Sequence, residues 1–259
     1  METKNEFKYF PVCIDNFFSN PNLIREFGLS LSKTSDVNSV WPGVRSLPLG
    51  EIDKSLNDQI ILKILSCYYD LRFVDVSWEA SGLLFQVIPS GAKLNEGWIH
   101  KDIDYDLAGL IYLTPNANLD SGTSLYNIKP EEEKNYMPFA SLSEQRSIDK
   151  TINENYLKQL RLNNDKFYLK TKFQNIYNRM IMYDSLEYHG ANNYYTGTDD
   201  RMTLVFFLKN VKSTRTKYPL QRVKDTAHFD DSIKFRIDYL NENIKSKTIT
   251  PEETDISDK

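Results

Sequence analysis

Apolar residues repeat along this chain with two different periods, and the period changes near residue 73. Before that point residues 7–18 alternate as in a strand, whereas the apolar residues of 51–69 fall three or four positions apart, which is the spacing of one helix face. Ser19 or Asn20 can cap such a helix, and Pro21 suits its first turn. The expected elements of this part are a strand over residues 7–18 and helices over residues 21–33 and 51–69.

From residue 73, short apolar runs are separated by Asp, Asn, Pro and Gly, a pattern typical of strands joined by turns. Because the strands are short and closely spaced, with helices mainly before them, the chain is expected to be mainly β with flanking helices, as a sandwich or barrel. The expected strands are two within residues 74–87, then 98–100, 108–113, 123–126, 167–173, 179–183 and 202–208, with helices near 149–162 and 231–243.

The length of 259 residues is enough to bury a sizeable core, and we expect one domain over residues 1–244. It would comprise an N-terminal helical support over about 1–72, a β core over about 73–210 and a C-terminal helical extension over 211–244. An insert at 127–173 falls where a lid or substrate wall is expected. The charged residues 245–259 are expected to be a disordered tail.

Composition and charge narrow the possible partners and the compartment. The formal net charge of −4 gives no reason to expect nucleic-acid binding. The charged N-terminus leads into no apolar stretch of signal-peptide length, and no run approaches the roughly 18 apolar residues of a membrane span. Cys13 and Cys67 form no zinc-type pair and are expected to be incidental thiols. We therefore expect a cytoplasmic protein without a membrane partner.

The candidate chemistry lies in two short segments, Trp98-Ile99-His100-Lys101-Asp102 and Tyr188-His189-Gly190. Side chains two apart on an extended strand point the same way, so His100 and Asp102 can bind one ion together, and His189 follows a strand of its own. Two imidazoles and one carboxylate on one face of an iron(II) ion leave the opposite face open for a chelating cosubstrate and dioxygen. The pattern predicts a non-haem iron site.

Other residues could compete for this role. Asp104 and Asp106 crowd the same segment, but we expect both to be solvated turn residues. His228-Phe229-Asp230 repeats the His-x-Asp pattern, although no histidine follows it and its neighbourhood is not strand-like. We therefore expect no metal there.

Arg201 is a candidate anchor for a cosubstrate carboxylate. It opens the apolar strand 202–208, and the turn-rich residues 192–197 before it predict a hairpin that returns Arg201 close to the strand carrying His189. A buried guanidinium can bind a carboxylate through two parallel hydrogen bonds, and Thr203, on the same face, can add a hydroxyl. The alternative is a surface ion pair of Arg201 with Asp199 or Asp200.

At these residues the sequence resembles the Fe(II)/2-oxoglutarate-dependent oxygenases, in particular prolyl-4-hydroxylase-like members common in bacteria and their phages. The resemblance covers about residues 80–210, where six short elements follow in the family's order. They are Trp98-Ile99-His100-Lys101-Asp102, Leu110-Ile111-Tyr112-Leu113-Thr114-Pro115, Ser121-Gly122-Thr123-Ser124-Leu125-Tyr126, Asn178-Arg179-Met180-Ile181-Met182-Tyr183-Asp184, Tyr188-His189-Gly190 and Arg201-Met202-Thr203.

The resemblance implies a double-stranded β-helix, also called a jelly roll and cupin-like, with His100, Asp102 and His189 as ligands of Fe(II). It implies that Arg201, helped by Thr203, binds the far carboxylate of 2-oxoglutarate, and that ascorbate can serve as a reductant. Tyr112 is either a hydroxyl donor to the cosubstrate or an aromatic of the barrel wall. The implied activity is hydroxylation of a C–H bond with release of succinate and CO₂, in the cytoplasm of a bacterium or of a phage's host.

The sequence departs from the family pattern at two positions. Many prolyl hydroxylases have lysine at the position of Arg201, so the resemblance does not imply a proline substrate, and Ser121 stands where glycine is usual. Peptidyl and small-molecule substrates both stay open, as does the oligomeric state. A cupin-like metalloenzyme would keep the three ligands without using Arg201, and an inactive binding or structural jelly roll would use none of them.

The segment Trp41-Pro42-Gly43-Val44-Arg45-Ser46 is expected to be a polar loop. Trp41 and Arg45 flank its Pro-Gly turn and could reach the mouth of a pocket. Loop residues with no spacing rule more often have a structural role, and that is the interpretation we favour for both.

Overall fold

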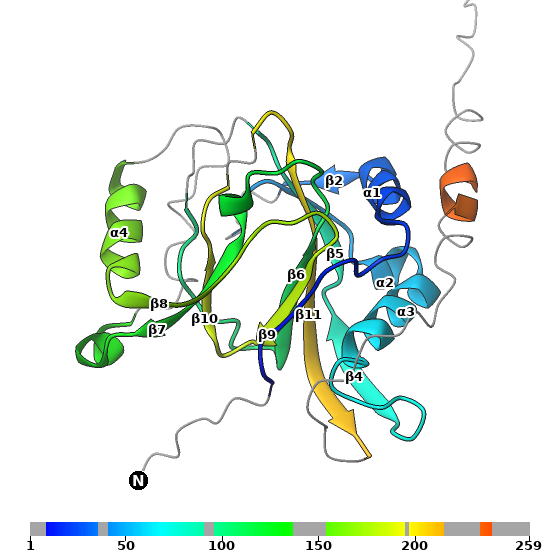
Figure 1. Ribbon diagram of the computed structural model, residues 1–259, viewed down its shortest axis with the longest axis horizontal. Coiled ribbons are helices and arrows are strands. Elements are labelled where there is room, and N and C mark those ends of the chain that lie inside the picture. The colour runs from blue at the N-terminus through cyan, green and yellow to red at the C-terminus, as the bar shows by residue number, and fades with distance from the viewer. Residues whose placement is uncertain are drawn as a thin grey trace, which may run out of the picture.

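Two antiparallel sheets face each other, and helices cover the outer face of the larger sheet (Figure 1). The computed structural model describes residues 9–35, 41–90, 96–136, 154–194, 197–214 and 234–239. The larger sheet runs, edge to edge, through β1 (Val12–Ile14), β9 (Met180–Asp184), β6 (Leu107–Tyr112), β11 (Arg201–Ser213), β5 (Leu84–Ile88), β3 (Val44–Ser46) and β2 (Lys33–Thr34), and β4 (Val76–Ser81) also pairs with β11. The smaller sheet is β10 (Tyr188–Ala191), β7 (Thr123–Ile128) and β8 (Phe167–Phe173).

The path of the chain between the sheets defines a double-stranded β-helix. From β5 in the larger sheet the chain crosses to the edge of the smaller one, where His100 bridges His189 of β10. It returns for β6, crosses for β7 and β8, and then alternates through β9, β10 and β11. This is the winding of a jelly roll, and it confirms the predicted fold class.

Strand alternation gives the larger sheet two apolar faces. On β11, Met202, Leu204 and Phe206 pack toward the helices, whereas Arg201, Thr203, Val205 and Phe207 line the interior between the sheets. Residues of β6 and β9 divide between the same two layers. Because both faces are covered, these strands are apolar almost throughout, which is why the sequence predicts them well.

The helices on the outer face are α1 (Pro21–Ser30), α2 (Leu49–Ile52) and α3 (Lys54–Leu65). The Asn20 side chain accepts a hydrogen bond from the Leu23 N–H and caps α1, as predicted. The predicted helix over 51–69 is wrong at its start, because Asp53 is extended and separates α2 from α3. Its carboxylate instead accepts from the Leu56 N–H and caps α3. The helix predicted over 21–33 ends at Ser30, since the chain then enters β2.

Three other expectations are corrected. The strand over 7–18 shortens to β1, because Asn16 adopts a positive φ of 54° and turns the chain out of the sheet. The predicted polar loop contains strand β3, which joins β5 through the register Arg45↔Gln86. Gly43 permits this with φ 78° and the carbonyl of Val87 close by. The predicted N-terminal helical support therefore also contributes strands to the larger sheet.

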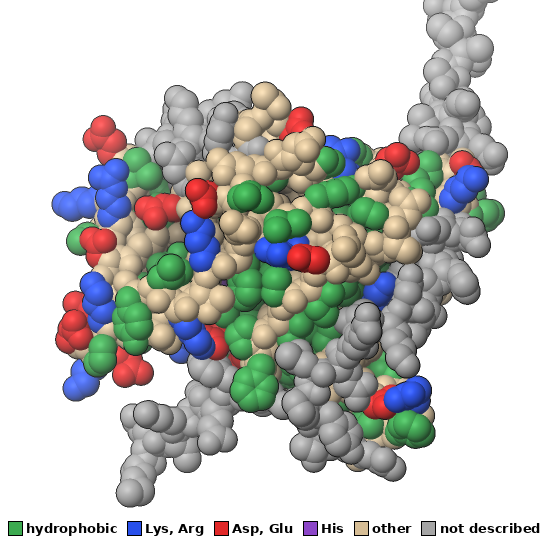
Figure 2. Space-filling model, viewed as in Figure 1, with side chains coloured by type: hydrophobic (Ala, Val, Ile, Leu, Met, Phe, Trp, Pro, Cys, Tyr) green, Lys and Arg blue, Asp and Glu red, His purple; other side chains and the backbone are tan. Residues whose placement is uncertain are grey.

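The expected strand over 98–100 forms only the single bridge at His100, and the helix expected near 149–162 is α4 (Glu154–Asn164). The first and last residues of the expected insert belong to β7 and β8, and η2 (Pro130–Asn135) follows β7. A short turn, η1 (Leu119–Ser121), precedes β7. Charged side chains of both signs gather around α4 and the β7–β8 end of the molecule (Figure 2), as expected for a solvated face.

Residues 234–239 are helical and contact the α2–α3 region, where Arg236 Nε donates to Asp53 Oδ2 at 2.8 Å. The rest of the predicted 231–243 helix, His228-Phe229-Asp230 and the expected tail over 245–259 lie outside the described residues. None of the described helices combines the length and apolar character needed to cross a bilayer.

Candidate metal centre

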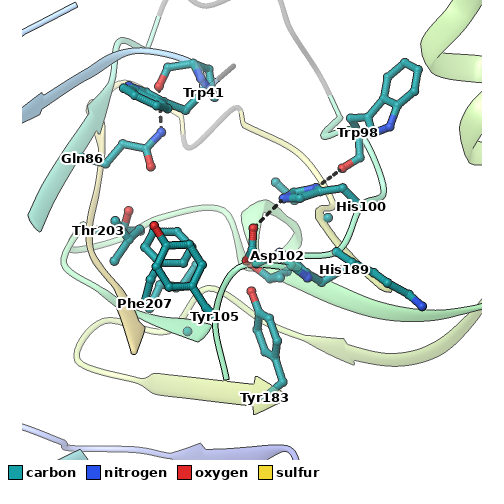
Figure 3. Close-up of a pocket in the computed structure, with 18 of the residues that line it drawn as sticks. Trp41, Gln86, Trp98, His100, Asp102, Tyr105, Tyr183, His189, Thr203 and Phe207 are labelled. Atoms are coloured by element: carbon teal, nitrogen blue, oxygen red, sulfur yellow. Dashed lines mark hydrogen bonds and ion pairs between the residues drawn. The ribbon is translucent and has the colours of Figure 1, made fainter. Parts of the chain in front are cut away.

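The fold brings His100, Asp102 and His189 together at the inner edge of the smaller sheet (Figure 3). One ligand atom from each side chain lies within 4.8 Å of the other two. Reciprocal backbone hydrogen bonds between His100 and His189, at 3.0 and 2.9 Å, hold the two imidazoles side by side. The Asp102 N–H donates to the Ser185 carbonyl at 2.9 Å, so the carboxylate is held against the β9–β10 connection.

Backbone carbonyls select the tautomer of each imidazole. Nδ1 of His100 lies 2.8 Å from the Trp98 carbonyl oxygen, and Nδ1 of His189 lies 2.9 Å from that of Glu187. A carbonyl oxygen can only accept, so each Nδ1 carries the hydrogen and each neutral ring has its lone pair on Nε2. These Nε2 atoms lie 3.7 Å and 3.3 Å from the two Asp102 carboxylate oxygens.

This arrangement fits a bound cation. Asp102 Oδ2 is buried and has no hydrogen-bond partner, and it faces the Nε2 lone pair of His189. Two acceptors at this separation need a proton or a metal ion between them. The separations of 3.7 and 3.3 Å between the Asp102 oxygens and the two Nε2 atoms are short enough for the three side chains to hold one ion together. The donor set of two imidazoles and one carboxylate is the one that suits non-haem iron.

The same groups perturb one another's ionisation. Burial opposes ionisation of the Asp102 carboxyl, but His189, His100 and Arg45 together hold its pKa below the ordinary value. Burial also opposes protonation of His189, yet Asp102 and the Glu187 carbonyl raise the pKa of this imidazole above its usual 6.5. A proton on His189 therefore competes with a metal ion for the same nitrogen.

The three side chains open into a cavity of about 460 Å³, which Arg201 and Thr203 of β11 also line. The Arg201 side chain is buried, its Nε donates to the Ser121 carbonyl at 3.2 Å, and burial lowers its pKa. Among the described residues, no carboxylate forms an ion pair with this guanidinium. The alternative of a surface ion pair with Asp199 or Asp200 is wrong, because the Arg201 side chain lies inside the barrel.

Tyr112 lies behind this part of the cavity. Its ring centroid is 5.8 Å from Cζ of Arg201, and its hydroxyl donates to Thr123 Oγ1 at 3.0 Å. Burial raises the pKa of the Tyr112 hydroxyl to about 12. Its proton is therefore already committed to Thr123, which itself lines the cavity. A direct contact of Tyr112 with a cosubstrate stays a prediction.

Asp104 and Asp106 do not join the three clustered side chains. Asp106 Oδ2 accepts from the Val211 N–H at 3.0 Å, and the Asp106 backbone pairs with Leu208, so this residue closes a turn onto β11. Asp104 lines the cavity mouth in an exposed turn. The expectation that both are turn residues rather than part of the cluster is thus consistent with the structure.

Sequence reasoning missed several cavity residues. Tyr183 projects inward from β9, with its ring centroid 4.6 Å from that of His189, and burial holds the pKa of its hydroxyl well above 10. The alternation of β9 could have identified it. Trp41 and Arg45, expected to be loop residues that could reach the mouth of a pocket, do line the cavity, and Arg45 does so from the unpredicted strand β3.

Comparisons with known proteins identify the family but not the activity. The chain belongs to DUF6445, a family of unknown function, which it matches over residues 8–195. No curated protein matches it.

Similar solved structures include a prolyl hydroxylase from Trichoplax adhaerens, in complex with a hypoxia inducible factor peptide fragment (13% identity, TM-score 0.45, covering 77% of this chain and 83% of that one). They also include HygX from Streptomyces hygroscopicus with nickel and 2-oxoglutarate bound (12%, 0.44, 77% and 83%) and a 2OG-Fe(II) oxygenase family oxidoreductase from Burkholderia pseudomallei (10%, 0.40, 77% and 84%). At such low scores the strand order of the two sheets, rather than these likenesses, carries the fold assignment.

Proposed function

We propose that this protein is an Fe(II)- and 2-oxoglutarate-dependent dioxygenase that hydroxylates a C–H bond and releases succinate and CO₂. The observation that carries the proposal is the shared cavity. It contains two imidazoles and a carboxylate with facing acceptor atoms, together with a buried guanidinium that has no carboxylate partner among the described residues. The first set suits iron, and the second suits the far end of a dicarboxylate.

In this proposal His100 Nε2, His189 Nε2 and the Asp102 carboxylate hold the iron, which when bound supplies the activation of dioxygen and the oxidation of the C–H bond. The carbonyls of Trp98 and Glu187 keep both Nε2 lone pairs directed at the ion. This orientation lets the protein hold iron without first reorganising the imidazoles.

Arg201 and Thr203 would bind the far carboxylate of 2-oxoglutarate. The Ser121 carbonyl fixes the Arg201 guanidinium in place, and Thr203 lies two residues along the same strand face. Tyr183 and the apolar inner face of the larger sheet would help to keep water out of the cavity. The substrate could be peptidyl, as in the prolyl hydroxylases, or a small molecule.

A cupin-like metalloenzyme that does not use an oxoacid is the competing function, and the burial of Arg201 argues against it. Burying a guanidinium without a counter-charge is costly, and a site that never receives an anion gains nothing from it. A vestigial, inactive jelly roll would have even less use for this charge.

Succinate formation tests the proposal. Protein incubated with Fe(II), ascorbate, 2-oxoglutarate and oxygen should release succinate above a protein-free control, because turnover without the prime substrate is common in this chemistry. Asp102→Ala should abolish both the release and the binding of iron measured by metal analysis. Asp104→Ala, which removes a neighbouring carboxylate outside the cluster, is the matched control and should keep its iron. Succinate release that is equal in the Asp102→Ala variant and the native protein would refute the proposal.

A further inference from the structure

A second arginine, Arg45, lines the same cavity as Arg201 but comes from a different strand. Arg45 of β3 pairs with Gln86 of β5, and Gln86 pairs with Thr203 of β11, so the three residues form one row across the larger sheet. Neighbouring strands lie about 4.8 Å apart, which places the backbone of Arg45 roughly 10 Å from that of β11. The two guanidinium groups are therefore carried by separate elements.

The Arg45 guanidinium is held in a defined orientation. Its Nη2 donates to Gln86 Oε1 at 3.1 Å, and Gln86 Nε2 donates to the Pro42 carbonyl at 2.7 Å. Its Cζ lies 4.1 Å from the centroid of the Trp41 ring. Stacking on an indole and an amide contact at one edge restrict a planar cation, so less ordering is needed when an anion binds.

This cation faces the metal centre. Arg45 lines the same cavity as His100, Asp102 and His189. In Figure 3, Trp41 and Gln86 lie on one side of the cavity, and His100, Asp102 and His189 lie on the other. The space between these two sides is where a substrate of the proposed enzyme would lie.

An apolar wall borders the same space. The rings of Tyr105 and Phe207 pack with their centroids 5.1 Å apart, and both line the cavity (Figure 3). This wall offers an apolar surface next to the Arg45 cation. Such a combination suits a small molecule with an anionic end and an apolar or aromatic body.

We propose that Arg45, positioned by Gln86 and Trp41, binds a carboxylate or phosphate group of the substrate. The body of the substrate then lies against Tyr105 and Phe207, with a C–H bond directed toward the metal centre. This inference rests on the proposed function and deepens it, because it names the substrate class of the same site. The substrate class is therefore a small organic acid or phosphate rather than an uncharged stretch of polypeptide.

Calorimetric titration with matched probes tests the inference. The full chain is loaded with Mn(II) and N-oxalylglycine, an inert analogue of 2-oxoglutarate, and titrated with 3-phenylpropionate, its uncharged amide and phenyl phosphate. Because a charge-assisted hydrogen bond is lost with the amide, the acid should bind about 10- to 100-fold more tightly. The tighter of the two anionic probes identifies the anion.

Variants of Arg45 and Lys101 test whether Arg45 is responsible for the preference for the acid over the amide. Arg45→Met should remove the preference for the acid, and Arg45→Lys, which keeps the charge, should retain part of it and guards against misfolding of the first variant. Lys101→Met is the matched control, because Lys101 lines the same cavity but places its Nζ over the Tyr188 ring. This variant should keep the preference. If it lost the preference as fully as Arg45→Met, the general charge of the cavity would be responsible and the inference would be wrong.

Other outcomes of these titrations also decide whether Arg45 binds an anionic group of the substrate. Equal binding of acid and amide, or binding of neither, overturns the inference. If Arg45→Met weakens N-oxalylglycine as strongly as Arg201→Ala does, Arg45 belongs to the cosubstrate site, and the inference fails while the proposed function stands. If N-oxalylglycine does not bind the native protein, the proposed function fails, and the acid-amide comparison made without it still decides the role of Arg45.

Discussion

At the scale of single residues, the cavity contains two separate groups of polar side chains, each suited to a different ligand. Asp102 and the two imidazoles present acceptors to one another, whereas Arg201 presents donors that no described carboxylate satisfies. The three acceptor side chains lack a cation between them, and Arg201 lacks an anionic partner among the described residues. The proposed iron and dicarboxylate would together satisfy both.

Arg201→Ala should raise the dissociation constant for 2-oxoglutarate about 10- to 100-fold, because two charge-assisted hydrogen bonds to its far carboxylate are lost. Iron binding should stay nearly unchanged, since Arg201 is not one of the three clustered side chains. Titration of 2-oxoglutarate into the anaerobic Fe(II)-loaded protein, followed by visible absorbance, measures the first quantity, and metal analysis measures the second. Equal loss of iron and of 2-oxoglutarate binding would contradict the assigned role.

The raised pKa of His189 predicts how stability depends on pH. Without metal, the folded state binds a proton on His189 more tightly than the unfolded chain does, so this contribution to stability is fully present below pH 6.5. It is lost as the pH rises through the higher folded-state pKa. The melting temperature of the metal-free protein should therefore fall across this range.

Manganese should reverse this trend, because it replaces the proton on the same nitrogen and binds more tightly as the pH rises. Thermal melts from pH 6 to 8, with chelator and with Mn(II), measure both effects, and His189→Gln should remove the pH dependence assigned to this imidazole. A metal-free melting temperature that rises over this interval in the native protein and not in the variant would contradict the proposed linkage.

At the scale of elements, helix α4 takes the place that a further strand would have beside the segment 97–100. Asn164 Nδ2 donates to the Gly97 carbonyl at 3.0 Å, and its Oδ1 accepts from the Ile99 N–H at 3.1 Å. Asn163 Nδ2 adds a bond to the Ile99 carbonyl at 3.0 Å. Two asparagines at the end of a helix thus satisfy backbone groups that a sheet edge would leave open, directly before His100.

Asn164→Ala should therefore loosen the segment that carries His100 and Asp102. Removing one side chain leaves the Ile99 N–H and the Gly97 carbonyl without these partners, which should cost about 1–3 kcal/mol of stability and lower manganese affinity several-fold. Denaturant unfolding and calorimetric Mn(II) titration measure the two effects. Lys158→Ala, at an exposed position of α4, is the control and should change neither. An unchanged Mn(II) affinity in Asn164→Ala would show that α4 does not support the metal centre.

At the scale of the whole molecule, the sequence predicts well those features that depend on residues close together in the chain. Strands β6, β9 and β11 lie between two packed layers, so their apolar runs identify them. The two-residue alternation of an extended chain is enough to predict that the side chains of His100 and Asp102 point the same way. Their meeting with His189 followed from the family resemblance, and the structure places the three side chains together.

The features that the sequence did not predict depend on partners distant along the chain. Strand β3, which carries Arg45, exists because Gly43 turns the chain beside Val87 of β5. The segment at 98–100 was expected to be a strand, but it forms a single bridge to His189 and is bonded to the end of α4. No local pattern shows either contact, since both are made across more than 40 residues of chain.

The C-terminal helical residues 234–239 allow a test of the helical layer alone, because they contact the α2–α3 region and are not among the residues that line the cavity. Arg236 Nε donates to Asp53 Oδ2, while Asp53 Oδ1 accepts from the Leu56 N–H at the start of α3. Arg236→Ala should lower the free energy of unfolding by about 1 kcal/mol or less, since its side chain is partly exposed. Asp53→Ala should cost about 1–2 kcal/mol, because the helix cap is lost as well.

The double variant should destabilise the protein by less than the sum of the two single changes, since Arg236 has lost its partner once Asp53 is absent. Denaturant unfolding of all four proteins gives this coupling energy, and succinate release by the same samples should not change. If Arg236→Ala altered succinate release without altering stability, the C-terminal extension would have to act on the cavity itself. The division of the molecule into a supporting helical layer and a chemical interior would then be wrong.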